Sequence, residues 1–197
     1  SVEWGYEEDG ATLLAHLEKI VQYNVQSSEK EKFDGVMLDI EPYISDSWKE
    51  NPEEYMDRYI SCMKKGYKFA QKNHLRTAIC IPRHYDNQGL TSGLEELIKE
   101  TCDEVAVMNY SCGNEIEAIR TEAALSEKYG KELHCILEFQ EVGKHGLTEN
   151  KTYRNKGIDN AKETWEKLQK EYKNINVTRD YHWSRPVREM LEEKNAD

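Results

Sequence analysis

The sequence FDGVMLDIEP, residues 33–42, provides the strongest structural and chemical signal in the chain. It starts as a short apolar run and ends in two acids two positions apart, Asp39 and Glu41, before Pro42 stops the run. Alternate side chains of an extended strand share one face, so both carboxylates are expected to point the same way. A run that is apolar on both faces is typical of a buried parallel strand. We therefore predict a buried strand over residues 33–41 with an acid pair at its carboxyl end.

The rest of the sequence alternates between apolar runs and amphipathic segments, which predicts parallel β/α units with right-handed crossovers. Residues 2–6 read as a short strand or the ragged end of one. No linker or repeat interrupts the alternation, so we predict a single domain over residues 1–197. The predicted strands span residues 33–41, 77–81, 105–110, 134–141 and 178–183, and the predicted helices span residues 11–26, 52–72, 91–100, 114–129, 156–173 and 186–194.

Polar and aromatic residues follow most of the predicted strands. No strand is followed by a glycine-rich phosphate loop, which argues against a nucleotide-binding open sheet. Functional groups at so many strand ends favour the rim of a barrel, because the active site of a β/α barrel is built there. These strand ends carry Asp39 and Glu41, Arg83 and His84, Asn109 and Tyr110, Glu138 and Gln140, and His182 and Trp183.

Composition excludes several kinds of partner. The 197 residues carry a formal net charge of -11, and the pI is near 5.1. An acidic chain without a basic patch is a poor match for nucleic acid or an anionic membrane, and a neutral ligand fits better than a polyanion. No apolar stretch approaches the roughly 20 residues that a membrane helix needs, so no membrane association is predicted.

The five cysteines are odd in number and none has zinc-site spacing, so neither a metal nor a cofactor is predicted. The sequence shows no signal peptide, and the cellular compartment stays open between extracellular and cytoplasmic.

Three motifs together resemble a known enzyme family. Residues 34–41, DGVMLDIE, resemble the DGxDxDxE signature on the fourth strand of family 18 glycoside hydrolases, the chitinase-like barrels. Residues 108–110, MNY, resemble that family's M-x-Y motif, and Trp183 lies where those enzymes carry an aromatic residue on the last strand. The pattern FDG-x-x-x-D-x-EPY is closer still to a group of bacterial glycosidase-like barrels. The resemblance covers residues 33–185 and implies a (β/α)8 barrel of the TIM type that acts on a glycan.

The resemblance implies a role for each residue of the predicted site. Glu41 would be the general acid that protonates the glycosidic oxygen. Asp39 would assist by orienting the substrate's own N-acetyl group as the nucleophile, and Tyr110 would hydrogen-bond that group. The predicted substrate-binding residues are Tyr43, Arg83, Asn109, Glu138 and Trp183.

Structural roles stay open for most of these residues. Asp39 and Glu41 could form an acid cluster neutralised by Arg83, and Glu138 could pair with the same cation. Tyr43 and Trp48 could pack an adjacent helix instead of binding a sugar. Trp183 could be a core residue.

Two departures from the family pattern favour an alternative function. Met37 stands where DGxDxDxE has its middle aspartate, and Ser111 stands where chitinases usually have an aspartate. The leading expectation is a glycoside hydrolase for a neutral or N-acetylated glycan. The alternatives are a catalytically inactive carbohydrate-binding barrel and another hydrolase on the same scaffold.

The strand numbering of the family implies a partial barrel. If residues 33–41 are the fourth strand, the chain supplies roughly strands 3–8, about five or six parallel strands. A complete barrel typically takes about 250 residues. Because soluble proteins avoid exposed sheet edges, a partial barrel is expected to self-associate.

Overall fold

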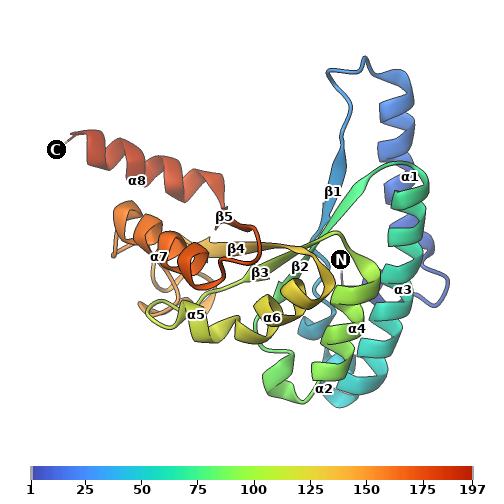
Figure 1. Ribbon diagram of the computed structural model, residues 1–197, viewed down its shortest axis with the longest axis horizontal. Helices are drawn as coiled ribbons and strands as arrows, with labels where there is room; N and C mark the ends of the chain where they lie inside the picture. The colour runs from blue at the N-terminus through green and yellow to red at the C-terminus, as the bar shows by residue number, and fades with distance from the viewer. Residues whose placement is uncertain (1, 197) are drawn as a thin grey trace. The chain divides into compact units, whose positions relative to one another are not determined.

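The computed structural model describes residues 2–196, in which parallel strands alternate with helices (Figure 1). Within this range, five strands follow one another as β1-β2-β3-β4-β5 in a parallel sheet, which confirms the predicted α/β class. The strands are β1 (Gly35–Leu38), β2 (Arg76–Pro82), β3 (Glu104–Met108), β4 (Glu132–Glu138) and β5 (Val177–His182). The helices are α1 (Ala11–Gln26), α2 (Asp46–Glu50), α3 (Pro52–Lys72), α4 (Thr91–Thr101), α5 (Glu115–Ala118), α6 (Arg120–Tyr129), α7 (Ile158–Glu171) and α8 (Ser184–Ala196).

Two predicted elements are wrong. Residues Glu3–Tyr6 form a 3-10 helix instead of a strand, and its turn brings Gly5 so close to the core that a Cβ there would lie 3.0 Å from Cγ2 of Ile40. The helix predicted over residues 114–129 is divided into α5 and α6 at Ile119, whose φ of -125° and ψ of 20° are not helical. The break places the fully buried side chain of Ile119 in the core.

The chain divides between Val105 and Ala106 into two compact units. In the first unit α3 is the central helix, because it contacts α1, α2, α4 and β2. Figure 1 shows α3 and α4 running side by side. The buried face of α3 carries Met56, Tyr59 and Met63, none of which is more than 1% exposed. Long apolar side chains at helical spacing therefore build this core.

The second unit packs α7 against β4 and β5. The strands pair in register from Leu133↔Val177 to Glu138↔His182. The indole N–H of Trp165 on α7 donates to the carbonyl of Cys135 on β4 at 3.0 Å, and both side chains are buried. A buried polar group needs such a partner, so this bond fixes α7 over the strand.

The predicted burial of the first strand is wrong. β1 has only four residues, and its Met37 is 52% exposed. The reason is its place at the end of the strand order: it pairs with β2, from Gly35↔Arg76 to Leu38↔Ile79, and no second strand of the described chain lies beyond it.

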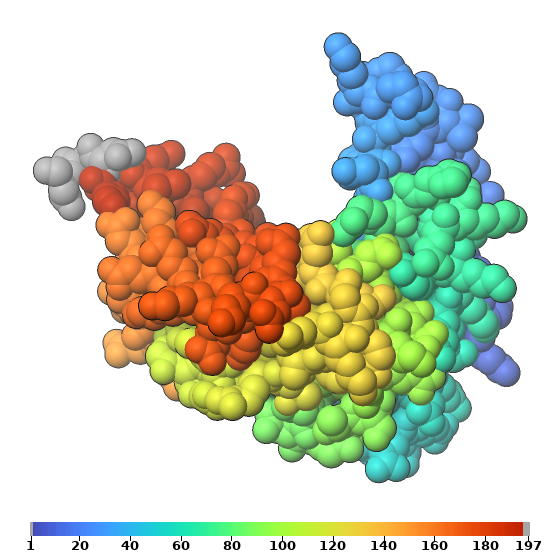
Figure 2. Space-filling model, viewed as in Figure 1, coloured from blue at the N-terminus to red at the C-terminus, as the bar shows by residue number. Residues whose placement is uncertain are grey.

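The carboxyl end of α1 and the turn after it project from the first unit, as the blue atoms in Figure 2 show. In α1 only Leu13 and Leu17 are buried, whereas Val25 is 80% exposed. The turn is held locally, because Asn24 exchanges hydrogen bonds of 2.7 and 2.8 Å with the backbone of Phe33. This projection brings the chain back from α1 into β1.

The close approach of α1 and α3 predicts that a larger residue at Gly66 lowers stability. A Cβ at Gly66 on α3 would lie 2.6 Å from Cδ2 of Leu13 and 3.2 Å from its Cγ. We expect Gly66→Ala to lower the free energy of unfolding by about 1–3 kcal/mol through overpacking, although alanine is otherwise the better helix former. Urea unfolding measures the change. Ser61→Ala, at an exposed position of the same helix, is the control and should shift stability by less than about 0.5 kcal/mol. A Gly66→Ala protein as stable as the wild type would contradict the packing.

Candidate functional site

Asp39 and Glu41 lie immediately after β1, at its carboxyl end. Ile40 between them is 3% exposed and packs into the core, so the flanking Asp39 and Glu41 project away from it. Asp39 is exposed and Glu41 is half-buried. Pro42 then begins a 3-10 turn, Pro42–Ile44, which ends the extended backbone. The buried Ile40 and Pro42 therefore hold both carboxylates at the strand end.

Tyr43 positions Glu41 directly, because its hydroxyl donates a hydrogen bond to the Glu41 carboxylate. The Tyr43 ring is itself held by edge contacts to His84, at 5.3 Å between centroids, and to Tyr85, at 6.0 Å. The Trp48 ring centroid lies 5.6 Å from that of Tyr85, and Trp48 is only 3% exposed. Trp48 is therefore buried against an aromatic ring, whereas Tyr43 contacts both Glu41 and the rings of His84 and Tyr85.

The residues after β2 contribute a cation and an uncharged imidazole. Arg83 is half-buried and forms no ion pair among residues 2–196. Burial, and next the positive charge of Arg83, lowers the pKa of His84 below its ordinary value of 6.5, with Asp86 opposing. Near pH 7 the imidazole that touches Tyr43 is therefore neutral.

In the second unit, Glu138 is a buried carboxylate with a full set of donors. It is the last residue of β4 and is 2% exposed. Its Oε1 accepts from the backbone N–H groups of Phe139 and Gln140 at 2.8 and 2.7 Å. Its Oε2 accepts from Nε2 of Gln140 at 3.2 Å and lies 2.9 Å from Nδ1 of His182.

These contacts decide the protonation state of Glu138. Burial raises its pKa, but the hydrogen bonds from His182 and Gln140 and the charge of His182 outweigh burial, so the net pKa is lowered. Glu138 is therefore an anion at neutral pH and a poor proton donor. Its geometry suits it to hold His182, whose side chain is 49% exposed, in one orientation.

Asn109 and Tyr110 follow β3 and differ in exposure. Asn109 is 1% exposed, and its Nδ2 donates to the carbonyl of Glu115 at 2.9 Å, so it ties the loop after β3 to α5. Tyr110 is half-buried, and its ring centroid lies 6.3 Å from that of His182. Of the two, only Tyr110 has an accessible side chain.

Trp183 is 44% exposed, so it is not the core residue that one alternative expected. It lines a pocket of about 360 Å³ together with Phe139 and the cationic side chains of Arg154 and Arg185. The peptide bond between His182 and Trp183 is cis. An exposed indole beside a pocket can stack on a ligand ring.

The structure thus gathers the predicted residues into two groups, one in each unit. Asp39, Glu41 and Tyr43 lie together in the first, and Arg83 adjoins them through His84. Glu138 and Tyr110 both contact His182 in the second. The sequence placed His182 and Gln140 at strand ends, but the predicted site residues did not include them. The signal for His182 was the parallel register, which pairs it with Glu138 on the neighbouring strand.

Comparisons of the chain with protein-family models, with curated proteins and with solved structures find no match. No helix within residues 2–196 is both long and apolar enough to cross a bilayer.

The Glu138 network predicts a stability that depends on pH. Because the pKa of Glu138 is lower in the folded chain, its contribution to the free energy of unfolding is present above its ordinary pKa of 4.5 and is lost as the pH falls through the lower folded value. We expect Glu138→Gln to lower that free energy by about 1–3 kcal/mol at neutral pH, since the amide N–H₂ faces donors. The difference from wild type should shrink on acidification, which urea unfolding at a series of pH values measures. Glu141→Gln, at an exposed neighbour, is the control, and a difference that is independent of pH would contradict the assignment.

Proposed function

We propose that this chain is a glycoside-hydrolase-type β/α barrel domain that acts on a neutral or N-acetylated glycan. The strand order supports the barrel. An open doubly wound sheet reverses its strand order at a switch point, whereas consecutive β/α units of a barrel keep the order of the sequence. The five described strands keep that order throughout. We assign them to the second part of the barrel, strands 4–8 if β1 is the fourth strand.

The observation that carries the catalytic proposal is the environment of Glu41. The carboxyl group lies at the carboxyl end of a parallel strand, half-buried, with Asp39 two residues before it and the hydroxyl of Tyr43 bonded to it. A tyrosine hydroxyl can donate to a carboxylate and accept from a carboxylic acid. The contact therefore holds Glu41 in place both before and after proton transfer.

In the proposed reaction Glu41 gives its proton to the glycosidic oxygen as the bond to the anomeric carbon breaks. The substrate's N-acetyl oxygen attacks that carbon, and Asp39 stabilises the resulting positive charge. Glu41 then takes a proton from the water that opens the intermediate. Tyr110 is proposed to hydrogen-bond the N-acetyl group.

The proposed glycan contacts follow from exposure and chemistry. Tyr43, Arg83 and Trp183 offer a hydroxyl, a cation and an exposed indole. Glu138, with its acceptor sites already occupied, is proposed to act through His182. Asn109 is buried, and it is proposed to support the site indirectly by holding the loop after β3.

The second candidate is a glycan-binding barrel without activity. Met37 favours it, because this residue shares the strand face of Asp39 and is 52% exposed where an assisting aspartate would stand. A thioether cannot take up a proton or stabilise a charge as a carboxylate does. Glycan binding by the wild type without turnover would select this candidate.

The general-acid role of Glu41 has a specific kinetic signature. We expect Glu41→Gln to lower kcat by about 10²-fold or more on an aryl chitobioside with a poor leaving group. The loss should be much smaller with a dinitrophenyl leaving group, which departs without protonation. Glu50→Gln, at the exposed end of α2, is the matched control and should leave both rates unchanged. Equal activity of wild type and Glu41→Gln on both substrates would reject the assignment.

The partial barrel also predicts self-association. β1 ends the strand order with Met37 exposed, and β5 ends it with Tyr181 48% exposed. Unpaired edges of this kind recruit another chain. We expect sedimentation velocity to show a dimer whose population rises with protein concentration. A monomer at every concentration would remove self-association from the proposal.

A further inference from the structure

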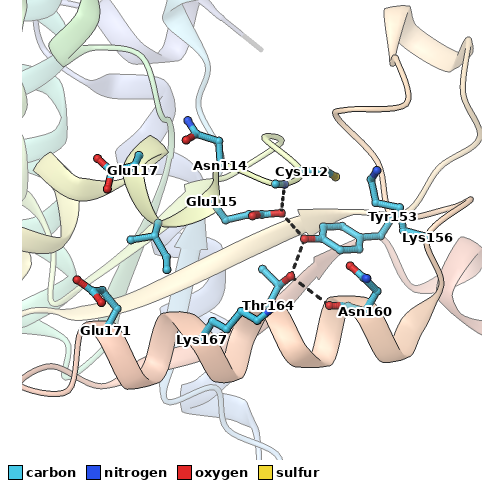
Figure 3. Close-up of a pocket in the computed structure, with 12 residues that line it drawn as sticks. Cys112, Asn114, Glu115, Glu117, Tyr153, Lys156, Asn160, Thr164, Lys167 and Glu171 are labelled. Carbon is cyan, nitrogen blue, oxygen red and sulfur yellow. Dashed lines mark hydrogen bonds between the residues drawn. The ribbon is translucent and has the colours of Figure 1, made fainter.

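One pocket of the second unit lies between α5 and α7, and its lining includes neither Glu138 nor Trp183. Its volume is about 710 Å³, within the range of small-molecule sites. Figure 3 shows Glu115 on one side and Tyr153 with Thr164 of α7 on the other, joined by a chain of hydrogen bonds. The lining also includes Cys112, Lys156, Asn160 and Lys167.

Glu115 is a preorganised carboxylate on the wall of this pocket. It is 7% exposed, and its Oε1 accepts from the backbone N–H of Gly113 at 2.8 Å and from the hydroxyl of Tyr153. The Tyr153 hydroxyl also lies 2.8 Å from Oγ1 of Thr164, which donates to the carbonyl of Asn160 at 3.1 Å. The side chain is therefore fixed from both sides of the pocket.

The second oxygen of Glu115, Oε2, has no such partner among residues 2–196. This oxygen is not one of the buried side-chain atoms that lack a partner, so it is open to the pocket. Glu138 of the same unit has four donor contacts. Oε2 of Glu115 is thus an accessible acceptor in a pocket, and a charged N–H donor is the strongest partner it can take.

Lys156 lines the same pocket and brings a positive charge to it. Lys156 is exposed and forms no ion pair within the described residues. Burial, and next the charge of Glu115, raises the pKa of the Cys112 thiol to about 11, and Lys156 opposes this shift. Glu115 and Lys156 therefore shift the pKa of Cys112 in opposite directions, and the thiol stays neutral near pH 7.

We propose that this pocket binds a small zwitterion with an ammonium and a carboxylate group, the chemistry of a free amino acid or short peptide. The ammonium donates to Oε2 of Glu115, and the carboxylate accepts from Lys156. The amide of Asn160 and the side chain of Lys167 line the remaining length, which leaves room for a side chain or a second residue. This site is independent of Glu41, so the failure of either proposal leaves the other standing.

Three matched peptides test the proposal on the ¹⁵N-labelled chain by NMR titration. Glycylglycine should shift the Gly113 amide resonance saturably, because that N–H bonds Glu115. N-acetylglycylglycine lacks the ammonium and glycylglycinamide lacks the carboxylate, and each should bind at least about tenfold more weakly. Equal binding of either blocked peptide, or no saturable shift with glycylglycine, would overturn the proposal.

Single-residue variants distinguish binding in this pocket from nonspecific binding elsewhere on the chain. We expect Lys156→Met and Glu115→Gln each to weaken glycylglycine by about tenfold or more. Lys151→Met in the same loop and Glu163→Gln on α7, both exposed and outside the pocket, should bind as the wild type does. Glu115 is buried, so the affinity of Glu115→Gln is interpreted only if its NMR spectrum shows that the variant is folded. Lys156 is exposed, so unchanged affinity in Lys156→Met rejects the site whatever happens to Glu115→Gln.

Discussion

The burial of one face of α3 is the interaction on which the first unit depends, and its effects reach the acid pair. Tyr59 of α3 is fully buried, and Gly5 lies so close that a Cβ there would be 3.2 Å from its ring and 3.3 Å from Pro42. The same position would be 3.0 Å from Ile40. Ile40 and Pro42 are thus packed in place, and Asp39 and Glu41 alternate with them along the chain. Apolar packing therefore positions the strand end, and the Tyr43 hydroxyl adds a hydrogen bond to Glu41.

The second unit shows two solutions for a buried carboxylate. Glu138 has four donor contacts, and these keep its pKa low. Glu115 has two donors, both on one oxygen. A satisfied carboxylate orders its neighbours, whereas one with an open oxygen at a pocket is available to a ligand. This difference assigns Glu138 to positioning His182 and Glu115 to binding, although both are nearly inaccessible to solvent.

Local sequence patterns predicted what local forces decide. The spacing of apolar residues placed the helices over residues 11–26 and 52–72 correctly, because helical periodicity is set within a few residues. Strand burial was predicted wrongly at Met37, since exposure depends on which strands lie beside β1 and not on its own residues. Glu115 was missed for a similar reason: its partner Tyr153 lies 38 residues away, and no local spacing records that contact. The register of β4 and β5 could have revealed the Glu138–His182 pair, because it follows from two predicted strands.

The contacts of Glu138 and Glu41 indicate which glutamate is suited to the proposed acid catalysis. A general acid must hold a proton at working pH and release it to the substrate. Glu138 does not qualify, because four donors favour its anion and leave no lone pair directed at a ligand. Glu41 is contacted by a hydroxyl that tolerates both protonation states, and it is half-buried at a strand end. Because Met37 brings no further carboxylate to this strand face, the proposed catalysis rests on Asp39 and Glu41 as its acid pair. Substitution of Asp39 should therefore be as damaging to turnover as substitution of Glu41.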